Sequence, residues 1–437
     1  VQIKTDPLYK YQWHLNNTAQ TSFASNAGTA GADLNVDGAI VSGRTGSGII
    51  VAVVDSGLEI AHEDIADNVV TNGSWNFTNS STDPTPSGSS GDHGTSVAGI
   101  IAAKGWNDIG VRGVAPNASI KAFNHGAAGN SSVTNEAKSL GGSTSNPNSS
   151  DVSIFNMSYA GSEWTGVPAN ESLVGPIDLT VTDQLRDGVT NLRGGKGGIY
   201  VYAVGNDYYL GATGSSSYSY CGDGANKGTY KIGCYDTIFD PIAKSPYLIG
   251  VAALDANNTK ANYSTPGAAN WVSAPGGEFG LNSSYASGSY PNTSIAYPGE
   301  PAIMTIDQSS CSKGYASSNS TTRNAFVDNS SPHPENTNCN YTNTFNGTSS
   351  AAPNVAGVVA LMLEANSNLT WRDVKHVLAT TAVQVDASFS ATAISSVNYV
   401  GWVTNGAGLK FHPWYGFGAV DATAAVNAAA SHTNLTN

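Results

Sequence analysis

The chain has 437 residues, enough for two or three domains, and only 12% of them are charged. Its 19 basic residues are outnumbered by 32 acidic ones, which gives a net charge of −13. This balance argues against binding to nucleic acid or to an anionic membrane, because both need a basic surface. The charge would attract cationic substrates, although solubility alone explains it equally well. No apolar stretch of about 18 residues is present, so no transmembrane helix is expected.

Buried strands alternate with helical stretches along most of the chain. The first predicted strand, Ile49–Val54, is a continuous run of apolar and mostly β-branched residues. Further strands are predicted at 119–123, 152–157, 198–204 and 247–252, and helices at 94–103, 133–140 and 177–192. This alternation indicates an α/β fold, a parallel sheet with helices on both faces. Two segments interrupt it, at about 206–245 and 277–343, and both are expected to be long surface insertions.

Three residues stand where a reactive site could form. Asp55 follows the first strand, at the carboxyl end where α/β folds place their sites. His93 precedes a small-residue helix, and Ser349 lies in the turn Gly347–Pro353 before a helix that is apolar nearly all round. The positive end of that helix dipole favours the negative charge of an attacking alkoxide. Each residue alone is more often a turn, cap or structural residue. Together they occur in the order Asp, His, Ser, which is that of subtilisin.

Three longer motifs are more specific. They are Asp6–Leu15, Leu363–Val374 and Tyr415–Ala422. With the Asp, His and Ser segments, they identify the chain as resembling subtilisin-type serine proteases, and within them the kexin/furin branch of proprotein convertases. The resemblance runs from Asp6 to about Asn427. It implies a subtilisin-like fold, one catalytic domain over 1–437, and no P domain within this chain.

The resemblance assigns a role to each residue of the site. Ser349 would be the nucleophile, His93 the general base, and Asp55 the group that orients the imidazole. Asn206 closes a buried strand and would supply the side-chain donor of the oxyanion hole. The alternative for Asn206 is an ordinary turn residue. Asp207 stands where kexin and furin have a glycine.

Specificity is also implied by position. Glu163 and Asp236 match acidic residues that line the pocket for a basic residue before the scissile bond, although either could be an ordinary surface acid. The convertases carry a second Asp after the catalytic one, where this chain has Ser56. The acidic stretch before the catalytic His is reduced to Ser89–Asp92. A preference for a second basic residue, two positions before the cut, should therefore be weaker than in furin.

A calcium ion belongs to the same expectation. The loop 104–111 directly follows the His93 helix, and a hard cation needs several oxygen ligands. An ordinary Gly-bearing connection to the next strand is the alternative. A glutamate that would hold a second calcium beside the basic-residue pocket is missing near Tyr263–Thr265. The residues that match the family's ligands are the side chains of Asp6, Asp64 and Asn107 and the carbonyls of Lys104, Ile109 and Val111.

The four cysteines form a local pattern, Cys221 near Cys234 and Cys311 near Cys339. It fits two surface disulfides in an oxidising compartment, but four cysteines allow three pairings and the sequence leaves the choice open. The chain begins at Val1 rather than Met, which predicts a processed, secreted form, extracellular or periplasmic. A propeptide or chaperone is expected to assist maturation, and a monomer is expected.

The sequence thus predicts a secreted serine endopeptidase that cuts protein or peptide substrates after Lys or Arg. A broad-specificity enzyme with an apolar preference remains open. A lipase or esterase would need a Gly-x-Ser-x-Gly elbow and the order Ser, Asp, His. A surface-binding module could use the 20 Tyr and 8 Trp but would leave the Asp, His and Ser unexplained. An inactive relative would have lost one of these three residues, and this chain keeps all of them.

Overall fold

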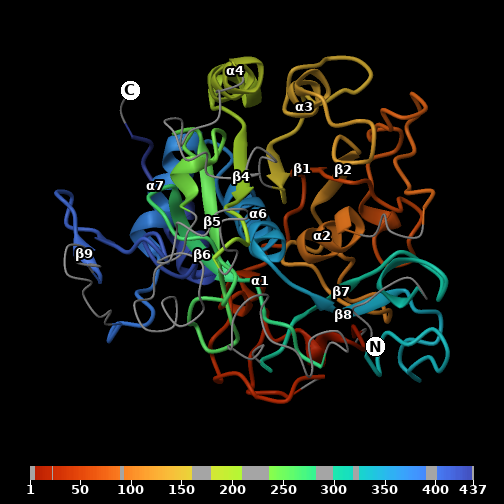
Figure 1. Ribbon diagram of the computed structural model, residues 1–437. Helices are drawn as coiled ribbons and strands as arrows, with labels where there is room; N and C mark the ends of the chain where they lie inside the picture. The colour runs from red at the N-terminus through yellow and green to blue at the C-terminus, as the bar shows by residue number, and fades with distance from the viewer. Residues whose placement is uncertain are drawn as a thin grey trace, which may run out of the picture.

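A six-stranded parallel sheet forms the centre of this computed structural model, with strand order β2-β1-β3-β4-β5-β6 (Figure 1). The strands are β1 (Ile50–Val54), β2 (Ser119–Phe123), β3 (Ile154–Met157), β4 (Ile199–Ala203), β5 (Leu248–Leu254) and β6 (Asn270–Pro275). The structure describes residues 5–21, 23–88, 93–159, 179–208, 236–281, 299–317, 324–389 and 401–435. The predicted α/β class and the predicted strands are confirmed, whereas β6 was not predicted.

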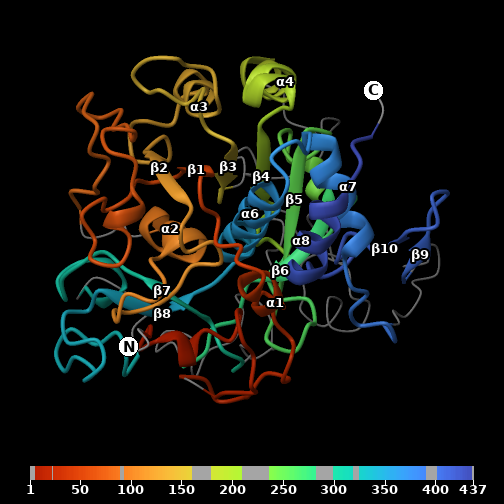
Figure 2. The ribbon, with the colours of Figure 1, turned by 180° about the vertical axis from the view of Figure 1, so that it is seen from behind.

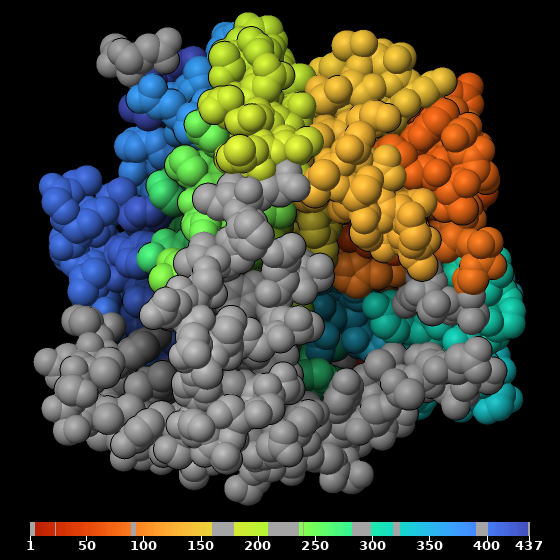
Figure 3. All heavy atoms as spheres, turned by 45° about the horizontal axis from the view of Figure 1, so that its top comes forward, coloured from red at the N-terminus to blue at the C-terminus, as the bar shows by residue number. Residues whose placement is uncertain are grey.

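Helices cover both faces of the sheet because its strands are apolar on both sides. In β1, Val51 and Val53 join one buried cluster, while Ala52 and Val54 join another. The first cluster includes α2 (His93–Ala102), α6 (Thr348–Ala365), α7 (Trp371–Thr381) and α8 (Ala422–Ser431). The second includes residues next to or within α3 (Val133–Ser139) and α4 (Leu179–Gly195). Figures 1 and 2 show these helices from opposite sides, and Figure 3 shows α3 and α4 next to one another on the surface.

The segment 277–343, expected to be a surface insertion, contributes to the interior in its described part. It contains β7 (Ile303–Ile306) and all but the end of β8 (Tyr341–Phe345), which pair antiparallel. Both strands are buried along their length. β7 packs beside α2, where Thr305 Oγ1 donates to Ser96 O at 2.8 Å, and β8 pairs with β7. The composition of the segment hid these strands because β7 is only four residues long within a polar stretch and β8 has Thr and Asn at its three central positions. Of 206–245, only 206–208 and 236–245 lie in the described part.

The remaining elements are short. They are α1 (Asp37–Val41), the hairpin β9 (Val403–Thr404) with β10 (Lys410–Phe411), and the 3-10 turns η1 (Tyr9–Tyr11), η2 (Ala66–Asn68), η3 (Thr237–Phe239) and η4 (Gly314–Ala316). Among the helices of the described residues, none is long and apolar enough to cross a membrane.

Candidate active site

The candidate site lies at the carboxyl edge of the sheet. β1, β3 and β4 are neighbours in the sheet, and their carboxyl ends are followed by Asp55, Ser158 and Asn206. Parallel strands end at the same edge, which is where α/β folds place reactive groups. The amino ends of α2 and α6 carry His93 and Ser349 to the same region. Ser158 and Ser349, which are 191 positions apart, are thereby in direct contact.

Asp55 and His93 form a direct pair. The Nδ1 atom of His93 lies 2.8 Å from Oδ1 of Asp55 and 3.0 Å from Oδ2. Asp55 is only 5% exposed, and its Oδ1 also accepts from the backbone N–H of Ser56 at 2.6 Å. A buried carboxylate against Nδ1 favours the tautomer that carries its proton there, which makes Nε2 the ring atom able to accept a proton.

The glycine after His93 permits this pairing. A Cβ atom on Gly94 would overlap the carbonyl oxygen of Gly57 and lie 3.0 Å from Cβ of Asp55. The N–H of Gly94 donates to Oγ of Ser56 at 3.1 Å. The first turn of α2 can therefore approach the Asp55–Gly57 turn closely only with glycine at this position.

Ser349 is the second residue of α6, just beyond the turn at Gly347. Gly347 has φ 100°, a conformation that side chains rarely adopt. The hydroxyl of Ser349 donates to the carbonyl oxygen of Ser158 at 3.2 Å, and Ser158 Oγ donates to Ser349 O at 3.0 Å. The reciprocal bonds hold the first turn of α6 against the segment that follows β3. Ser349 thus lies where the helix dipole favours negative charge.

Asn206 is held by the residue before the serine. Its Oδ1 accepts from the backbone N–H of Thr348 at 2.8 Å and from Thr348 Oγ1 at 3.0 Å. The Asn206 side chain is nevertheless exposed, and no described residue accepts from its Nδ2 group. An amide anchored through its oxygen leaves its N–H donors available to a ligand. This arrangement suits a donor to a developing oxyanion.

Sequence reasoning missed three residues that support this site. Ser56, Ser158 and Thr348 fix the positions of His93, Ser349 and Asn206 through the bonds given above. Serine and threonine are common in this chain, so composition could not distinguish them. A position directly beside a candidate residue or directly after a buried strand was the available signal.

The acids proposed for the substrate pocket have different outcomes. Glu163 lies outside the described residues. Asp236 is half-buried and caps η3, where its Oδ1 accepts from the N–H of Ile238 at 3.0 Å. Burial raises the pKa of Asp236. Beside Asn206, burial and then the charge of Asp240 raise the pKa of Asp207. Asp207 adds a carboxyl group directly after Asn206 that was not among the predicted pocket residues.

The residues expected to bind calcium are brought together around loop 104–111. Asp64 contacts Asn107 (Nδ2 to Oδ1, 2.7 Å), the N–H of Val111 (2.8 Å) and, through its carbonyl, the N–H of Lys104 (2.7 Å). Asp6 accepts from the N–H of Asn107 at 3.3 Å. It also accepts from Nε of Arg112 at 2.6 Å, so part of its charge is already compensated.

The loop carbonyls decide whether a cation fits. No described residue donates to the carbonyl oxygens of Lys104, Ile109 or Val111. Within the described part of the chain, no three His, Cys, Asp or Glu side chains gather as a metal centre. A cation here would therefore be held largely by carbonyl and amide oxygens beside two buried carboxylates, a set that suits calcium. The residues present fit the ion.

Cys311 and Cys339 form a disulfide, which confirms one of the two expected local pairs. Cys221 and Cys234 lie outside the described residues.

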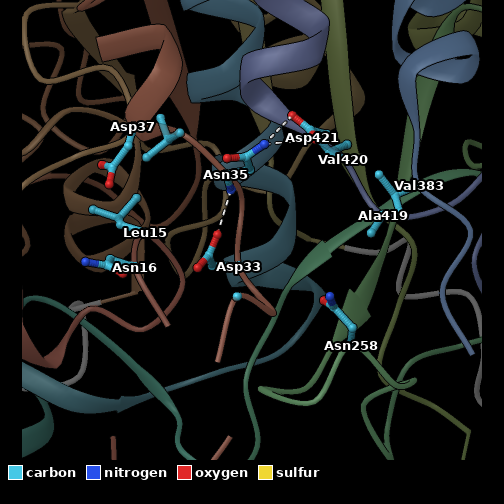
Figure 4. Close-up of a pocket in the computed structure, with 12 residues that line it drawn as sticks. Leu15, Asn16, Asp33, Asn35, Asp37, Asn258, Val383, Ala419, Val420 and Asp421 are labelled. Carbon is cyan, nitrogen blue, oxygen red and sulfur yellow. Dashed lines mark hydrogen bonds between the residues drawn. The ribbon is translucent and has the colours of Figure 1, made fainter. Parts of the chain in front are cut away.

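A separate cavity of about 380 Å³ lies between residues 15–37 and residues 383–421 (Figure 4). Asp55, His93, Asn206 and Ser349 are not among its lining residues. Its acids already have structural partners. Asp33 accepts from the N–H groups of Asn17 and Asn35, and Asp421 caps α8 and accepts from the Asn35 side chain. Asp33 thus stabilises the first segment, and Asp421 links the second segment to it through Asn35.

Comparison with known proteins shows which family the chain belongs to. The sequence model of the subtilase family matches residues 46–418. The chain belongs to the subtilase family. The expectation of a subtilisin-type chain similar to kexins is confirmed by individual relatives. The chain is 34% identical to the extracellular serine protease of Aeromonas sobria, over 98% of this chain and 65% of that protein. It is 32% identical to kexin of Saccharomyces cerevisiae, over 95% of this chain and 39% of kexin.

A solved structure shows the same fold. The crystal structure of the Aeromonas sobria serine protease in complex with a chaperone superposes with a TM-score of 0.82 at 32% identity. The match covers 99% of this subtilase and 68% of that chain. The subtilase therefore spans about two thirds of one relative and two fifths of the other.

Proposed function

We propose that this subtilase is a serine endopeptidase that uses Ser349, His93 and Asp55. The observation that carries the proposal is the pairing of His93 Nδ1 with the Asp55 carboxylate at 2.8 Å, at the sheet edge where Ser349 lies in the first turn of a buried helix. The exposed Asn206, anchored to Thr348, completes the set. A lipase, an esterase or a binding module gives no account of this arrangement within a subtilase fold.

The proposed reaction follows from the roles of these groups. Nε2 of His93 takes the proton of Ser349 Oγ as the hydroxyl attacks the peptide carbonyl carbon. Asp55 holds the ring and stabilises the imidazolium that forms. The N–H of Ser349 and Nδ2 of Asn206 stabilise the oxyanion. His93 then protonates the leaving amine, and water hydrolyses the acyl-enzyme by the same steps in reverse.

We further propose a preference for Lys or Arg before the scissile bond. The likeness to kexin supports it, and so do the half-buried carboxyl groups of Asp207 and Asp236. A buried carboxylate without a partner is unfavourable, and a cationic side chain would relieve it. Asp236 is the weaker candidate for binding a basic side chain, because one oxygen of its carboxylate already accepts the capping hydrogen bond from Ile238. A broad-specificity enzyme with an apolar preference is the competing form.

Secretion, chaperone assistance and calcium binding are parts of the same proposal. The relative from Aeromonas sobria is named extracellular, and the Cys311–Cys339 disulfide suits an oxidising compartment. A related protease was crystallised with a chaperone, so we propose that a chaperone or propeptide assists this chain too. Asp6, Asp64 and Asn107 would hold calcium together with three loop carbonyls, and the ion would stiffen the loop that follows α2. The absence of nucleic-acid, membrane and self-association partners stays a prediction.

Labelling and kinetics test the proposal together. A fluorophosphonate probe should label the purified protein, and Ser349→Ala should abolish both labelling and peptide hydrolysis while the melting temperature is retained. Ser431→Ala, an exposed serine at the end of α8, is the matched control. Hydrolysis by Ser349→Ala within tenfold of wild type would refute the nucleophile.

Matched peptides with Lys, Arg, Phe or Leu before the scissile bond test the specificity. A kcat/KM that is at least tenfold higher for Lys and Arg is expected. Equal kcat/KM values for the Phe or Leu peptides would show that the pocket has broad specificity. Asp236→Asn should then change kcat/KM by the same factor for all four peptides.

A further inference from the structure

Tyr263 is a buried side chain that reaches the turn before the nucleophile. It is 6% exposed and belongs to the large apolar cluster on the α2 and α6 face of the sheet. Its hydroxyl accepts from the backbone N–H of Gly347 at 2.9 Å and donates to the carbonyl oxygen of Gly277 at 2.5 Å. The hydroxyl therefore bridges the segment after β6 and the turn that presents Ser349.

Residues 263–265, which include Tyr263, also hold the backbone around Asn206. The carbonyl oxygen of Tyr263 accepts from the N–H of Tyr208 at 3.0 Å, and the N–H of Thr265 donates to Gly205 O at 3.0 Å. These two bonds bracket Asn206 and Asp207. Residues 263–265 thus fix the backbone around one expected oxyanion donor, while the Tyr263 side chain fixes the turn that carries the other.

Gly347 is the weak point that this bridge secures. Its φ of 100° lies in a region open to glycine, and glycine is the residue with the greatest backbone freedom. Gly347 is the residue that precedes α6, and it has no side chain of its own with which to cap the helix. Without the Tyr263 hydroxyl, the Gly347 N–H would lose its hydrogen bond in a buried place. A small rotation there moves the N–H of Ser349 relative to Nδ2 of Asn206.

We propose that Tyr263 is a positioning residue that sets the distance between the two oxyanion donors, Ser349 N–H and Asn206 Nδ2. This proposal rests on the proposed function, because it concerns the geometry of the same reaction. Tyr263 touches neither substrate nor reacting atoms and acts through Gly347. Burial, with the nearby charge of Glu278, holds the pKa of Tyr263 far above its usual range, so the hydroxyl keeps its proton and can donate to Gly277 at any working pH.

Tyr263→Phe tests the proposal because it removes the hydroxyl and keeps the ring. We expect kcat, per active site titrated with fluorophosphonate, to fall about tenfold with KM changed less than twofold. Tyr200→Phe is the matched control. Tyr200 is a fully buried tyrosine whose hydroxyl donates to Leu140 O at 2.8 Å on the other face of the sheet. Its kcat should equal that of wild type, even where its melting temperature falls.

A double-mutant cycle separates positioning from general loosening. If Tyr263 acts through the oxyanion hole, Tyr263→Phe should lower kcat less than about twofold in an Asn206→Ala background, because the paired donors are already lost. An equal tenfold loss in both backgrounds would overturn the proposal. So would a kcat within twofold of wild type for Tyr263→Phe alone, while hydrolysis still depends on Ser349. If Ser349→Ala stays active, the proposed function and this inference both fall.

Discussion

Gly347 lies next to Asn206, the proposed oxyanion donor, and two residues before Ser349, the proposed nucleophile. Its backbone is in a conformation that favours glycine, and a Cβ atom there would lie 3.2 Å from Nδ2 of Asn206. Any side chain at this position would both strain the turn and press on the proposed oxyanion donor. The small residues around Ser349 are therefore requirements of geometry as well as of space.

Gly347→Ala should accordingly lower kcat by about a hundredfold, because the donor and the nucleophile are displaced together. Gly408→Ala is the matched control: Gly408 has φ 79°, but no atom lies within 4 Å of the place that a Cβ atom would occupy. Both changes should cost about 1–2 kcal/mol of stability from backbone strain, measured by urea unfolding. Equal kcat values for the two variants would show that Asn206 is not displaced.

Among the elements, α6 is the one on which the others are assembled. It is buried over most of its length and packs against β3 to β6, α2 and α8. Glycine at position 357 allows Val114 to lie against the helix, since a Cβ atom would come 2.5 Å from that of Val114. A helix surrounded in this way holds Ser349 rigidly, which a preorganised site needs.

α7, by contrast, lies away from Ser349 and depends on its own cap. Thr370 and Asp373 form a capping box, with Thr370 N–H bonded to Asp373 at 2.7 Å and Asp373 N–H bonded to Thr370 Oγ1 at 3.2 Å. Thr370→Ala should lower the free energy of unfolding by about 1 kcal/mol and leave kcat unchanged. Thr380→Ala, in the last turn of the same helix, should change it by less than about 0.5 kcal/mol. Equal losses of unfolding free energy in Thr370→Ala and Thr380→Ala would show that the cap is not the cause.

For the molecule as a whole, the proposed calcium ion should raise the melting temperature. Dialysis against EGTA should lower the melting temperature by several degrees, because an ion bound only by the folded chain stabilises it by mass action. Added calcium should restore it. Asp64→Asn should remove the calcium response, whereas Asp108→Asn, an exposed acid of the same loop, should keep it. An EGTA-treated protein, free of metal by elemental analysis, with an unchanged melting temperature would refute the site.

Buried histidines should make the fold sensitive to acid. Burial lowers the pKa of His14 to about 3, and those of His125 and His412 to about 4, from 6.5. Below pH 6.5 the unfolded chain binds protons at these positions and the folded chain does not, so stability falls as the pH is lowered towards 4. Each contributes on the order of 2 kcal/mol of loss by pH 5.

His14→Phe tests this dependence. It should flatten the fall in unfolding free energy between pH 6.5 and 4, because a buried ring remains and the titrating group is gone. The exposed His376→Gln is the control and should leave the slope as in wild type. An unchanged slope in His14→Phe would show that other groups govern acid unfolding.

The main strands and the positions of the candidate site residues were open to prediction because local patterns carry them, whereas the role proposed for Asn206 came from the family resemblance. Asp55, His93, Asn206 and Ser349 each sit at a strand end or helix start, and such boundaries are written in runs of apolar and small residues. β6 and β8 were not predicted because neighbouring elements bury their polar residues, such as Ser273 and Asn343, which the local pattern does not mark. β7 was not predicted because it is a short apolar run within a polar stretch. Asp236 was predicted as a pocket residue, and its capping of η3 became evident only in the structure.

The sequence by itself determines which reactive groups are available and which segments become strands, because both depend on residue type and spacing along the chain. Distances between groups do not, because they depend on contacts between segments far apart in the sequence. The pairing of His93 with Asp55, the anchoring of Asn206 on Thr348, and the bond from Gly347 to Tyr263 each join residues at least 38 positions apart. Only the packing of α2 and α6 at the edge of the sheet sets these contacts.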